Sequence, residues 1–376
     1  MTILQRYFGR EILRSVFFVM AALLALFTFF DMVSELQSIN KGNYRIQHAL
    51  IYVLLGLPGY IYEFMPIAVL IGTIYVLAQF ASNSEFTIMR AASMSTAMAG
   101  MILARIGLIF VVLTFVFGEI VTPLTSQFAE KFKIMAIGNA FNPSFKSGLW
   151  TKDLIRENGL TGAVTGSRFI NIKEIAPNRN LLQLKIFEFD QDFRMIREVH
   201  AQRAEYLGNN RWRLFDAKAT SYPKTLDAEQ IAAVASQDFP FYELVSEITP
   251  EILSALFIDP ERMSALNLLT YIKHLDDNKQ DSEVYAIALW KKLTFPFAVL
   301  VMMALALPFA YLHVRSGGVS LKIFSGIMIG IVFYLINALF SHLGLLNTWP
   351  APVTAVIPSL IFLSLAALGL RYVERN

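Results

Sequence analysis

Six long apolar runs dominate the sequence, three before and three after a polar middle segment. They cover residues 15–30, about 58–78 with a start nearer Ala49 as the alternative, 99–121, 293–312, 323–343 and 353–370. Runs of this length with few charges are typical of membrane-spanning helices, because only a helix satisfies its own backbone groups in lipid. No small-residue cleavage site follows the first run, so we interpret it as an uncleaved span rather than a signal peptide.

The middle segment changes to an alternation of apolar and polar residues, for example over 182–186. Alternation with period two predicts half-buried strands. The Gly-Asn-Asn sequence at 208–210 separates two such runs and predicts a hairpin. We therefore expect an all-β sandwich or jelly roll over about 135–250, with an immunoglobulin-like module as the alternative. From Ser264 through Lys273 the period lengthens, which predicts a helix that leads back to the membrane.

These elements predict an α-helical integral membrane protein with six transmembrane helices, three plus three, and an inserted all-β, jelly-roll-like domain. The expected boundaries are 1–123 for the first three spans, 124–263 for the exported β domain, and 264–376 for a linker helix and the last three spans. A short helix at about 82–95 joins spans two and three.

Orientation follows from the Lys and Arg residues in the short flanks, which tend to stay in the cytoplasm. One set of flanks holds Arg6, Arg10, Arg14, Arg90, Arg105, Arg315, Lys322, Arg371 and Arg375, against Lys41 and Arg45 in the short loops of the other set. Both termini are therefore expected in the cytoplasm and the β domain outside the membrane.

The composition supports a membrane protein and excludes several other classes. The chain is 55% hydrophobic with a mean hydropathy of +0.51, and 43 of its 61 charged residues lie within 124–292. A soluble enzyme is nearly excluded, and a net charge of +3 is too small to indicate nucleic-acid binding. No glycine precedes a lysine, so a P-loop is absent. The chain has no cysteine, its five histidines lack metal-ligand spacing, and no GxSxG motif occurs, so we expect neither a catalytic nor a metal site.

The loop between spans two and three carries the first candidate site. Glu85 fits the first turn of a short helix capped by Ser82 or Asn83, with Phe86 and Met89 on one face. Such an apolar face suits docking into a groove of another protein. The alternative is a helix that lies on the membrane surface.

Three further features complete the candidate residues. Lys41, Arg45, Lys131 and Lys133 lie just outside the membrane at the exits of spans one and three. They could bind phosphates of an anionic lipid headgroup or simply anchor helix ends. Gly326 and Gly330 in span five form a pair of small residues that lets another helix approach closely. Glu63 is the one candidate for a charge inside a span, and we favour an interfacial carboxylate, or a buried partner for a neighbouring subunit, over a proton-coupling role.

In their order and spacing, these motifs resemble the YjgP/YjgQ family of lipopolysaccharide-export permeases, the LptF/LptG type. The residues that carry the resemblance are Pro58, Pro66 and Gly72; Ser84, Glu85, Met89 and Ala91; Gly118, Glu119 and Pro123; Gly148 through Asp153; Tyr271 through Lys273; Trp290 through Lys292; Val301 through Ala306; and Gly326 through Gly330 with Phe333 and Tyr334. Two positions depart from the family pattern: Ser93 stands where relatives tend to carry glycine, and Gln37 and Ser38 stand where some carry lysine.

The resemblance implies a non-catalytic permease subunit in the Gram-negative inner membrane, paired with the sister permease LptF and driven by ATP hydrolysis on a dimeric ATPase, LptB. The resemblance also implies that no cofactor would be bound directly. Lipopolysaccharide would pass through LptF and LptC to a periplasmic bridge. Spans one and five would line the cavity and form its gates, Ser84 through Arg90 would become the helix that couples to the ATPase, and Gly326 and Gly330 would face a gate helix. The alternative from the residues alone is a membrane receptor or scaffold whose β domain binds a ligand, and an ion-coupled transporter that uses Glu63 ranks third.

Overall fold

The computed structural model describes residues 3–137, 148–176, 180–222, 234–256, 258–311, 318–347 and 349–375. Six helical segments within these ranges are long and apolar enough to cross a membrane, which confirms the predicted number of spans. They are α1 (Ile3–Glu35); α2 (Ile46–Ser82); α4 (Thr96–Val116), which continues through the π-helical segment η2 (Phe117–Val121) into α5 (Thr122–Ile137); α8 (Glu283–Ala306), which continues into η5 (Leu307–Ala310); α9 (Val319–Asn347); and α10 (Ala351–Arg375).

The helices extend beyond the apolar runs, and two of them change the expected ends of spans two and three. The second span begins at Ile46, in agreement with the start nearer Ala49, and runs for 37 residues through Pro58 and Pro66. The third span does not end at Val121, because its helix continues with more polar residues to Ile137. Hydropathy detects the part of a helix that lies in lipid, so it misses a continuation that stands in water.

The polar middle segment forms an antiparallel sheet. Its strands are β1 (Leu149–Asn158), β2 (Thr161–Ile175), β3 (Leu181–Asp190), β4 (Met195–Gly208), β5 (Arg211–Ser221) and β6 (Ala235–Val245), paired in sequential order. The predicted hairpin is confirmed: Gly208 pairs with Arg211, and Asn209 and Asn210 both have positive φ, as a two-residue turn between twisted strands requires.

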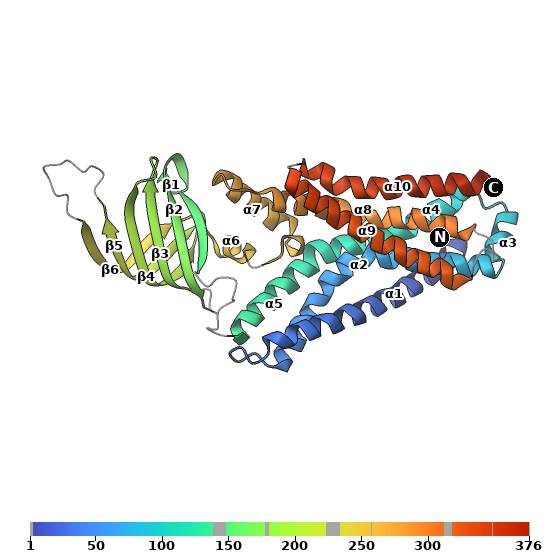
Figure 1. The fold of residues 1–376 in the computed structure, drawn as a ribbon, viewed down its shortest axis with the longest axis horizontal. Helices are drawn as coiled ribbons and strands as arrows, with labels where there is room; N and C mark the ends of the chain where they lie inside the picture. Colours follow the sequence, from blue (N-terminus) through green and yellow to red (C-terminus); the bar gives the residue numbers. More distant parts are fainter. Residues whose placement is uncertain are drawn as a thin grey trace.

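The described strands make one curved sheet, not the two facing sheets of a sandwich (Figure 1). The second layer consists of α6 (Pro250–Ala255) and α7 (Ala265–Asp277). Ile252, Leu253, Leu268 and Tyr271 from these helices join the core on one face of the sheet. The helix predicted from Ser264 is α7, and the Ser264 hydroxyl caps it by accepting from Asn267 N–H.

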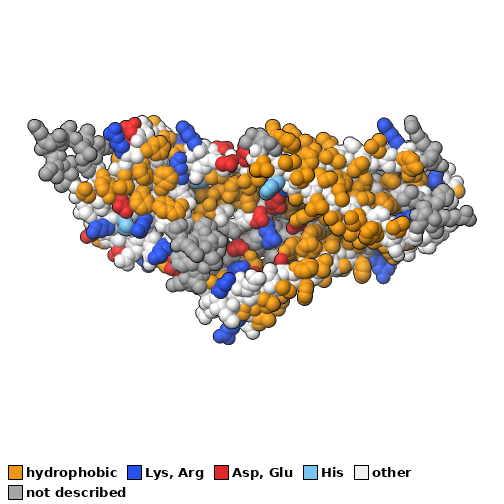
Figure 2. Space-filling view, viewed as in Figure 1, with side chains coloured by type: hydrophobic (Ala, Val, Ile, Leu, Met, Phe, Trp, Pro, Cys, Tyr) orange, Lys and Arg blue, Asp and Glu red, His pale blue; other side chains and the backbone are white. Residues whose placement is uncertain are grey.

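The long axis of the molecule separates two ends. Figure 1 shows both termini and the short helix α3 (Glu85–Ala91) at one end and the sheet at the other, with α7 between the sheet and the helical block. Apolar side chains cover the helical block, and charged side chains gather at its junction with the sheet (Figure 2). The six spans therefore hold the termini and the β domain on opposite sides of the apolar belt. Arg315, one of the predicted flank cations, lies outside the described residues.

Candidate functional site

The short helix α3 is tied to the first span through a carboxylate. The Tyr7 hydroxyl donates to Glu85 Oε2 at 2.9 Å, and Asn83 Nδ2 donates to Glu85 Oε1 at 3.2 Å. Helix α3 begins after Ser84, at the N-cap position, rather than after Ser82 or Asn83. Glu85 therefore links α3 to α1 through a hydrogen bond.

The apolar face of α3 differs from the expected exposed one. Phe86 is only 2% exposed, and its ring meets Tyr311 edge to face at 5.0 Å between centroids. Met89 packs against the same core, and the Arg90 guanidinium lies over the Tyr311 ring at 5.0 Å. The face that we expected to dock into another protein is thus used inside the chain. Ile88, 66% exposed, is the large apolar side chain that α3 presents outward.

The end of α3 is defined despite the serine where glycine was expected. Ser93 has φ +71°, its N–H donates to Arg90 O at 3.0 Å, and Met94 N–H donates to Met89 O at 3.1 Å. This pair of bonds is the Schellman motif, in which a residue with left-handed backbone closes the helix. Ser93 therefore occupies the position that favours glycine, and α3 stops at Ala91.

The second group of candidates lies at the opposite end of the spans, where α1, α2 and α5 meet. Lys133 Nζ pairs with Glu35 Oε1 at 2.8 Å and lies 4.2 Å from the centre of the Tyr52 ring. Glu35 is itself buried, at 7% exposed. Lys133 thus neutralises a buried carboxylate of the first span, and a phosphate would compete with Glu35 for it.

Lys41 and Arg45 are exposed on the turn between α1 and α2. That turn is held against the end of α5, because a Cβ on Gly42, where φ is +59°, would lie 1.8 Å from Ile137 O. Tyr44 is fully buried beneath the turn, in a small cluster with Ala136. The two cations therefore stand on a fixed turn and face solvent.

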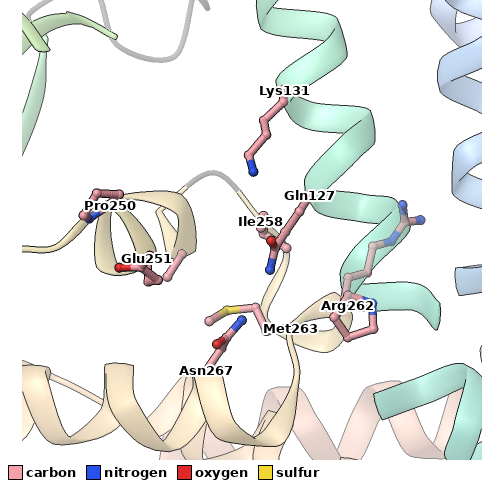
Figure 3. Close-up of a pocket in the computed structure, with 10 residues that line it drawn as sticks. Gln127, Lys131, Pro250, Glu251, Ile258, Arg262, Met263 and Asn267 are labelled. Atoms are coloured by element: carbon pink, nitrogen blue, oxygen red, sulfur yellow. The ribbon is translucent and has the colours of Figure 1, made fainter. Parts of the chain in front are cut away.

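Lys131 points away from this group. It lies on the opposite side of α5 and lines a cleft of about 260 Å³ together with Gln127, Glu251, Arg262 and Asn267. Figure 3 shows Lys131 and Gln127 directed from α5 towards α6. The four predicted cations thus divide into Lys41 and Arg45 on the turn, Lys133 among the spans, and Lys131 beneath the β domain.

Glu63 lies deep within α2, 17 residues after its first residue. Tyr334 on α9 lies close to it. Both residues line a pocket of about 370 Å³ that also contains Arg262 and Lys292. Because these cations come from the segment and the helix that return from the β domain, Glu63 faces the polar outer side of the spans rather than open lipid.

Gly326 and Gly330 pack against α2 of the same chain. A Cβ on Gly326 would lie 2.8 Å from Ile74 Cδ1, and a Cβ on Gly330 would lie 2.9 Å from Ile67 Cγ2. The expectation that these glycines face a gate helix is corrected here: within the described chain the partner is the second span, the most buried one. Small residues are needed there because the two backbones approach closely.

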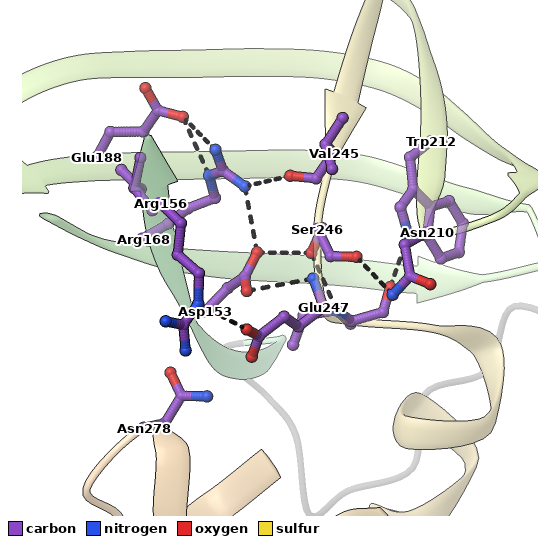
Figure 4. A network of polar contacts seen from close by, with 12 residues as sticks. Asp153, Arg156, Arg168, Glu188, Asn210, Trp212, Val245, Ser246, Glu247 and Asn278 are labelled. Carbon is purple, nitrogen blue, oxygen red and sulfur yellow. Dashed lines mark hydrogen bonds and ion pairs between the residues drawn. The ribbon is translucent and has the colours of Figure 1, made fainter. Parts of the chain in front are cut away.

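A network of charged side chains inside the β domain was not foreseen from the sequence. Arg168 contacts Asp153 at 3.1 Å and Glu188 at 3.0 Å, and donates to Val245 O at 3.0 Å. All three charged residues are buried, Asp153 completely. The Ser246 hydroxyl donates to Asp153 at 2.6 Å (Figure 4). Burial raises the pKa of Asp153, although Arg168 and Ser246 oppose the shift.

The network continues from the sheet to α7. Glu247 lies 3.3 Å from Arg156 and 3.8 Å from His274, and the contacts with His274 and Arg156 lower the pKa of Glu247. Lys152 Nζ donates to Asn278 O at 2.9 Å, directly after α7. No group of three or more His, Asp or Glu side chains in the described ranges is placed to hold a metal ion. The network therefore joins sheet to helix.

Arg262 is a second residue that sequence reasoning missed. It ends the 3-10 turn η4 (Pro260–Arg262) and lines three pockets, one of them shared with Asp31, Glu35 and Glu130. Its guanidinium lies 5.6 Å from the centre of the Tyr60 ring. A single arginine in a polar return segment carries no sequence signal, because its carboxylate neighbours come from α1, α2 and α5.

Comparisons with known proteins agree over nearly the whole chain. The sequence model of the family described as "Lipopolysaccharide export system permease LptF/LptG" matches residues 6–372. The lipopolysaccharide export system permease protein LptG of Haemophilus influenzae is 30% identical over 361 residues, 96% of each chain. LptG of Escherichia coli K12 is 27% identical over 363 residues, 96% of this chain and 95% of that one. The resemblance found in the sequence motifs is thereby confirmed.

Proposed function

The chain belongs to the LptF/LptG family of lipopolysaccharide export permeases, and we propose that it is a subunit of an ABC-type transporter in the inner membrane. In this proposal it pairs with the sister permease LptF, extracts lipopolysaccharide from the membrane, and hands it to the periplasmic bridge through LptF and LptC. ATP is hydrolysed by LptB, bound at the α3 end of the molecule. Both termini lie in the cytoplasm and the β domain lies in the periplasm.

The observation that carries the proposal is the unequal burial of the spans. In the most apolar window of each helix, 78% of α2 is buried inside the chain, against 11% of α1 and 17% of α9. Helices α1 and α9 both pack against α2. Two exposed apolar helices on one buried helix fit the wall of a cavity that a second permease and acyl chains complete.

The contacts of α3 suggest how ATP-driven motion reaches that wall. Glu85 connects α3 to α1 through Tyr7, and Phe86 connects it to the end of η5 through Tyr311. A displacement of α3 by the ATPase would therefore move Tyr7 on α1 and Tyr311 after η5 together. Ile88 is the exposed apolar side chain available to the ATPase.

For the headgroup we propose Lys41 and Arg45 as phosphate contacts. Both are exposed on a turn fixed against α5, and a lysine or arginine bound to a phosphate makes a charge-assisted hydrogen bond. Lys133 would join them only after release from Glu35. Lys131, beneath the β domain, is the candidate for a later contact along the exit path.

The proposal is tested by site-specific photo-crosslinking in inner-membrane vesicles that contain the co-expressed sister permease and LptB. A photoreactive residue replaces Phe18 on α1 or Leu335 on α9, which are 75% and 58% exposed. The matched control is Val112 on α4, 61% exposed. We expect crosslinks to lipopolysaccharide at Phe18 and Leu335 that respond to ATP. Equal crosslinking at Val112, or none on α1 and α9, would refute the cavity.

Coupling through α3 has its own test. We expect Ile88→Asp to lose LptB during purification, because a buried carboxylate at an apolar contact carries an uncompensated desolvation cost. The control is Thr87→Asp, which places the same charge on the neighbouring exposed position. Retention of LptB by Ile88→Asp, or equal loss in both variants, would show that Ile88 is not the contact.

A further inference from the structure

The junction between span three and the β domain contains an irregular helical turn with a carboxylate at its centre. Within η2, Thr122 N–H donates to Phe117 O, five residues back, so one residue is inserted into the α-helical register. Such π-helical turns are rare and often occur at functional positions. Gly118 allows the turn to lie against Tyr62, since a Cβ there would be 2.5 Å from the ring. Glu119 is the charged residue of this turn.

Glu119 caps a helix that belongs to another part of the chain. Both of its carboxylate oxygens accept from Ala265 N–H, each at 3.0 Å. Ala265 is the first residue of α7, where N–H groups have no partner inside the helix and the helix dipole favours a negative charge. Ser264 caps the third position of the same turn, so the two side chains satisfy different donors. Span three thus holds the first turn of α7 across 146 positions of sequence.

The rest of α7 contributes to the core of the β domain. Leu268, Tyr271 and Leu275 belong to the core that α7 shares with the sheet. Lys152 on β1 donates to Asn278 O directly after the helix. Figure 1 shows α7 between the sheet and the helical block. Tyr271 also packs against Tyr285 of α8, with the ring centroids 4.6 Å apart. Helix α7 is therefore shared between the β domain and α8, while its first turn is also attached to span three.

We propose that Glu119 is a positioning residue that sets the angle of α7, and with it the β domain, relative to the membrane helices. This inference rests on the proposed function, because the angle matters when lipid leaves the cavity beneath the β domain. Helix α7 has 13 residues, about 20 Å at 1.5 Å per residue, so a tilt of roughly 10° displaces its far end by about 3–4 Å. A small change at Glu119 is thus amplified at the sheet.

A second attachment makes the role of Glu119 specific. Lys292 Nζ donates to Met263 O, and Lys291 pairs with Glu261 at 2.8 Å, so α8 holds the turn that precedes α7. Helix α7 is thus held by its packing along α8 and, at its first turn, by Glu119 of span three. Loss of the Glu119 contact leaves the packing on α8, so we expect the chain to fold while the first turn of α7 gains freedom relative to span three.

The test measures the distance between the two parts of the complete chain. The protein contains no cysteine, so spin labels on Gln47→Cys in α2 and Gln202→Cys in β4, both exposed, report without background labelling. Pulsed electron–electron double resonance in nanodiscs gives the distribution of distances between the two spin labels. We expect a single narrow distribution with Glu119 present, a broader one with additional distances for Glu119→Ala, and intermediate behaviour for Glu119→Gln, which keeps one acceptor oxygen.

The matched control is Glu283→Gln, which removes a carboxylate from the first turn of the next helix, α8. It should leave the distribution unchanged. In vesicles with the partner subunits, Glu119→Ala should also transfer less lipopolysaccharide to its acceptor while the thermal midpoint of the β domain stays the same. An unchanged distribution in Glu119→Ala overturns the positioning role. A broadened distribution with undiminished transfer overturns its part in export. Absence of lipopolysaccharide from the unsubstituted protein would instead refute the proposed function, so the two failures are distinguishable.

Discussion

Replacement of Arg168 by methionine should destabilise the β domain through the two carboxylates that it leaves behind. Removal of one partner from a buried ion pair costs about 3–5 kcal/mol, because the remaining charge has neither water nor a counter-ion. Glu188 keeps Arg197 at 3.8 Å, and Asp153 keeps the Ser246 hydroxyl. These remaining contacts place the expected loss at the lower end, about 3 kcal/mol.

Hydrogen exchange measured by mass spectrometry on the full chain in nanodiscs gives this quantity. A loss of about 3 kcal/mol predicts amide exchange that is roughly 160-fold faster in β2 and β3, at 1.36 kcal/mol for each factor of ten. The control is Arg213→Met, which breaks an exposed cross-strand pair with Glu243 whose side chains are 41% and 44% accessible. Exposed pairs contribute about 0–1 kcal/mol, so exchange should change by less than about sixfold.

The pH dependence of the Arg168→Met effect separates a charge effect from lost packing. Burial already raises the pKa of Asp153, and loss of Arg168 removes a contact that lowers it. A carboxyl group with a raised pKa in the folded state binds more protons when folded, so stability falls as pH rises through that pKa. The destabilisation should therefore be larger at pH 8 than at pH 5. Equal destabilisation at both values, or an effect no larger than that of Arg213→Met, would refute the reasoning.

Three further predictions concern packing, a helix end and an ion pair. Gly330→Val should cost about 1–3 kcal/mol and lower the thermal midpoint of the membrane helices, because its Cβ would meet Ile67 at 2.9 Å. Ser93→Gly should slow amide exchange in α3 about fivefold, because glycine removes about 1 kcal/mol of left-handed strain. Glu247→Gln should flatten the fall in thermal stability on acidification. The contacts with His274 and Arg156 lower the pKa of Glu247, so this stability is present above its ordinary pKa and is lost as pH falls through the folded value.

Each of these three predictions has a control variant elsewhere in the chain. Gly56→Ala, in α2 with nothing within 4 Å of the added Cβ, should not lower the thermal midpoint. Gly208 already occupies a left-handed position, so Gly208→Ser should speed exchange at its hairpin as Ser93→Gly slows it in α3. Glu205→Gln, exposed on β4, should leave the acid slope unchanged. An unchanged midpoint in Gly330→Val, faster exchange in Ser93→Gly, or an unaltered slope in Glu247→Gln would contradict the corresponding argument.

The elements that could be predicted from the sequence are those fixed by local composition. The six spans follow from the lengths of the apolar runs, and the β4–β5 hairpin follows from its Gly-Asn-Asn turn. The buried charges of the β domain could not be predicted in this way, because they depend on contacts between strands. Asp153 is in phase with Leu149, and Arg168 with Ile170, so these charges occupy positions that the alternation assigns to the core. In the sequence they interrupt the pattern of each strand. Only the pairing of three strands shows that the interruptions meet and neutralise one another.

The basic residues outside the membrane show why proximity in sequence misleads at this site. Lys131 and Lys133 are two positions apart on α5, and at about 100° per residue they point roughly 200° apart, to opposite sides of the helix. One therefore meets α6 beneath the β domain, and the other meets Glu35 on the first span. Under the proposed function, a lipid phosphate at the mouth of the spans would reach Lys41 and Arg45 on the turn without disturbing a buried pair. A contact with Lys133 would require that Glu35 first lose its cation, so headgroup binding would then be linked to the position of α1.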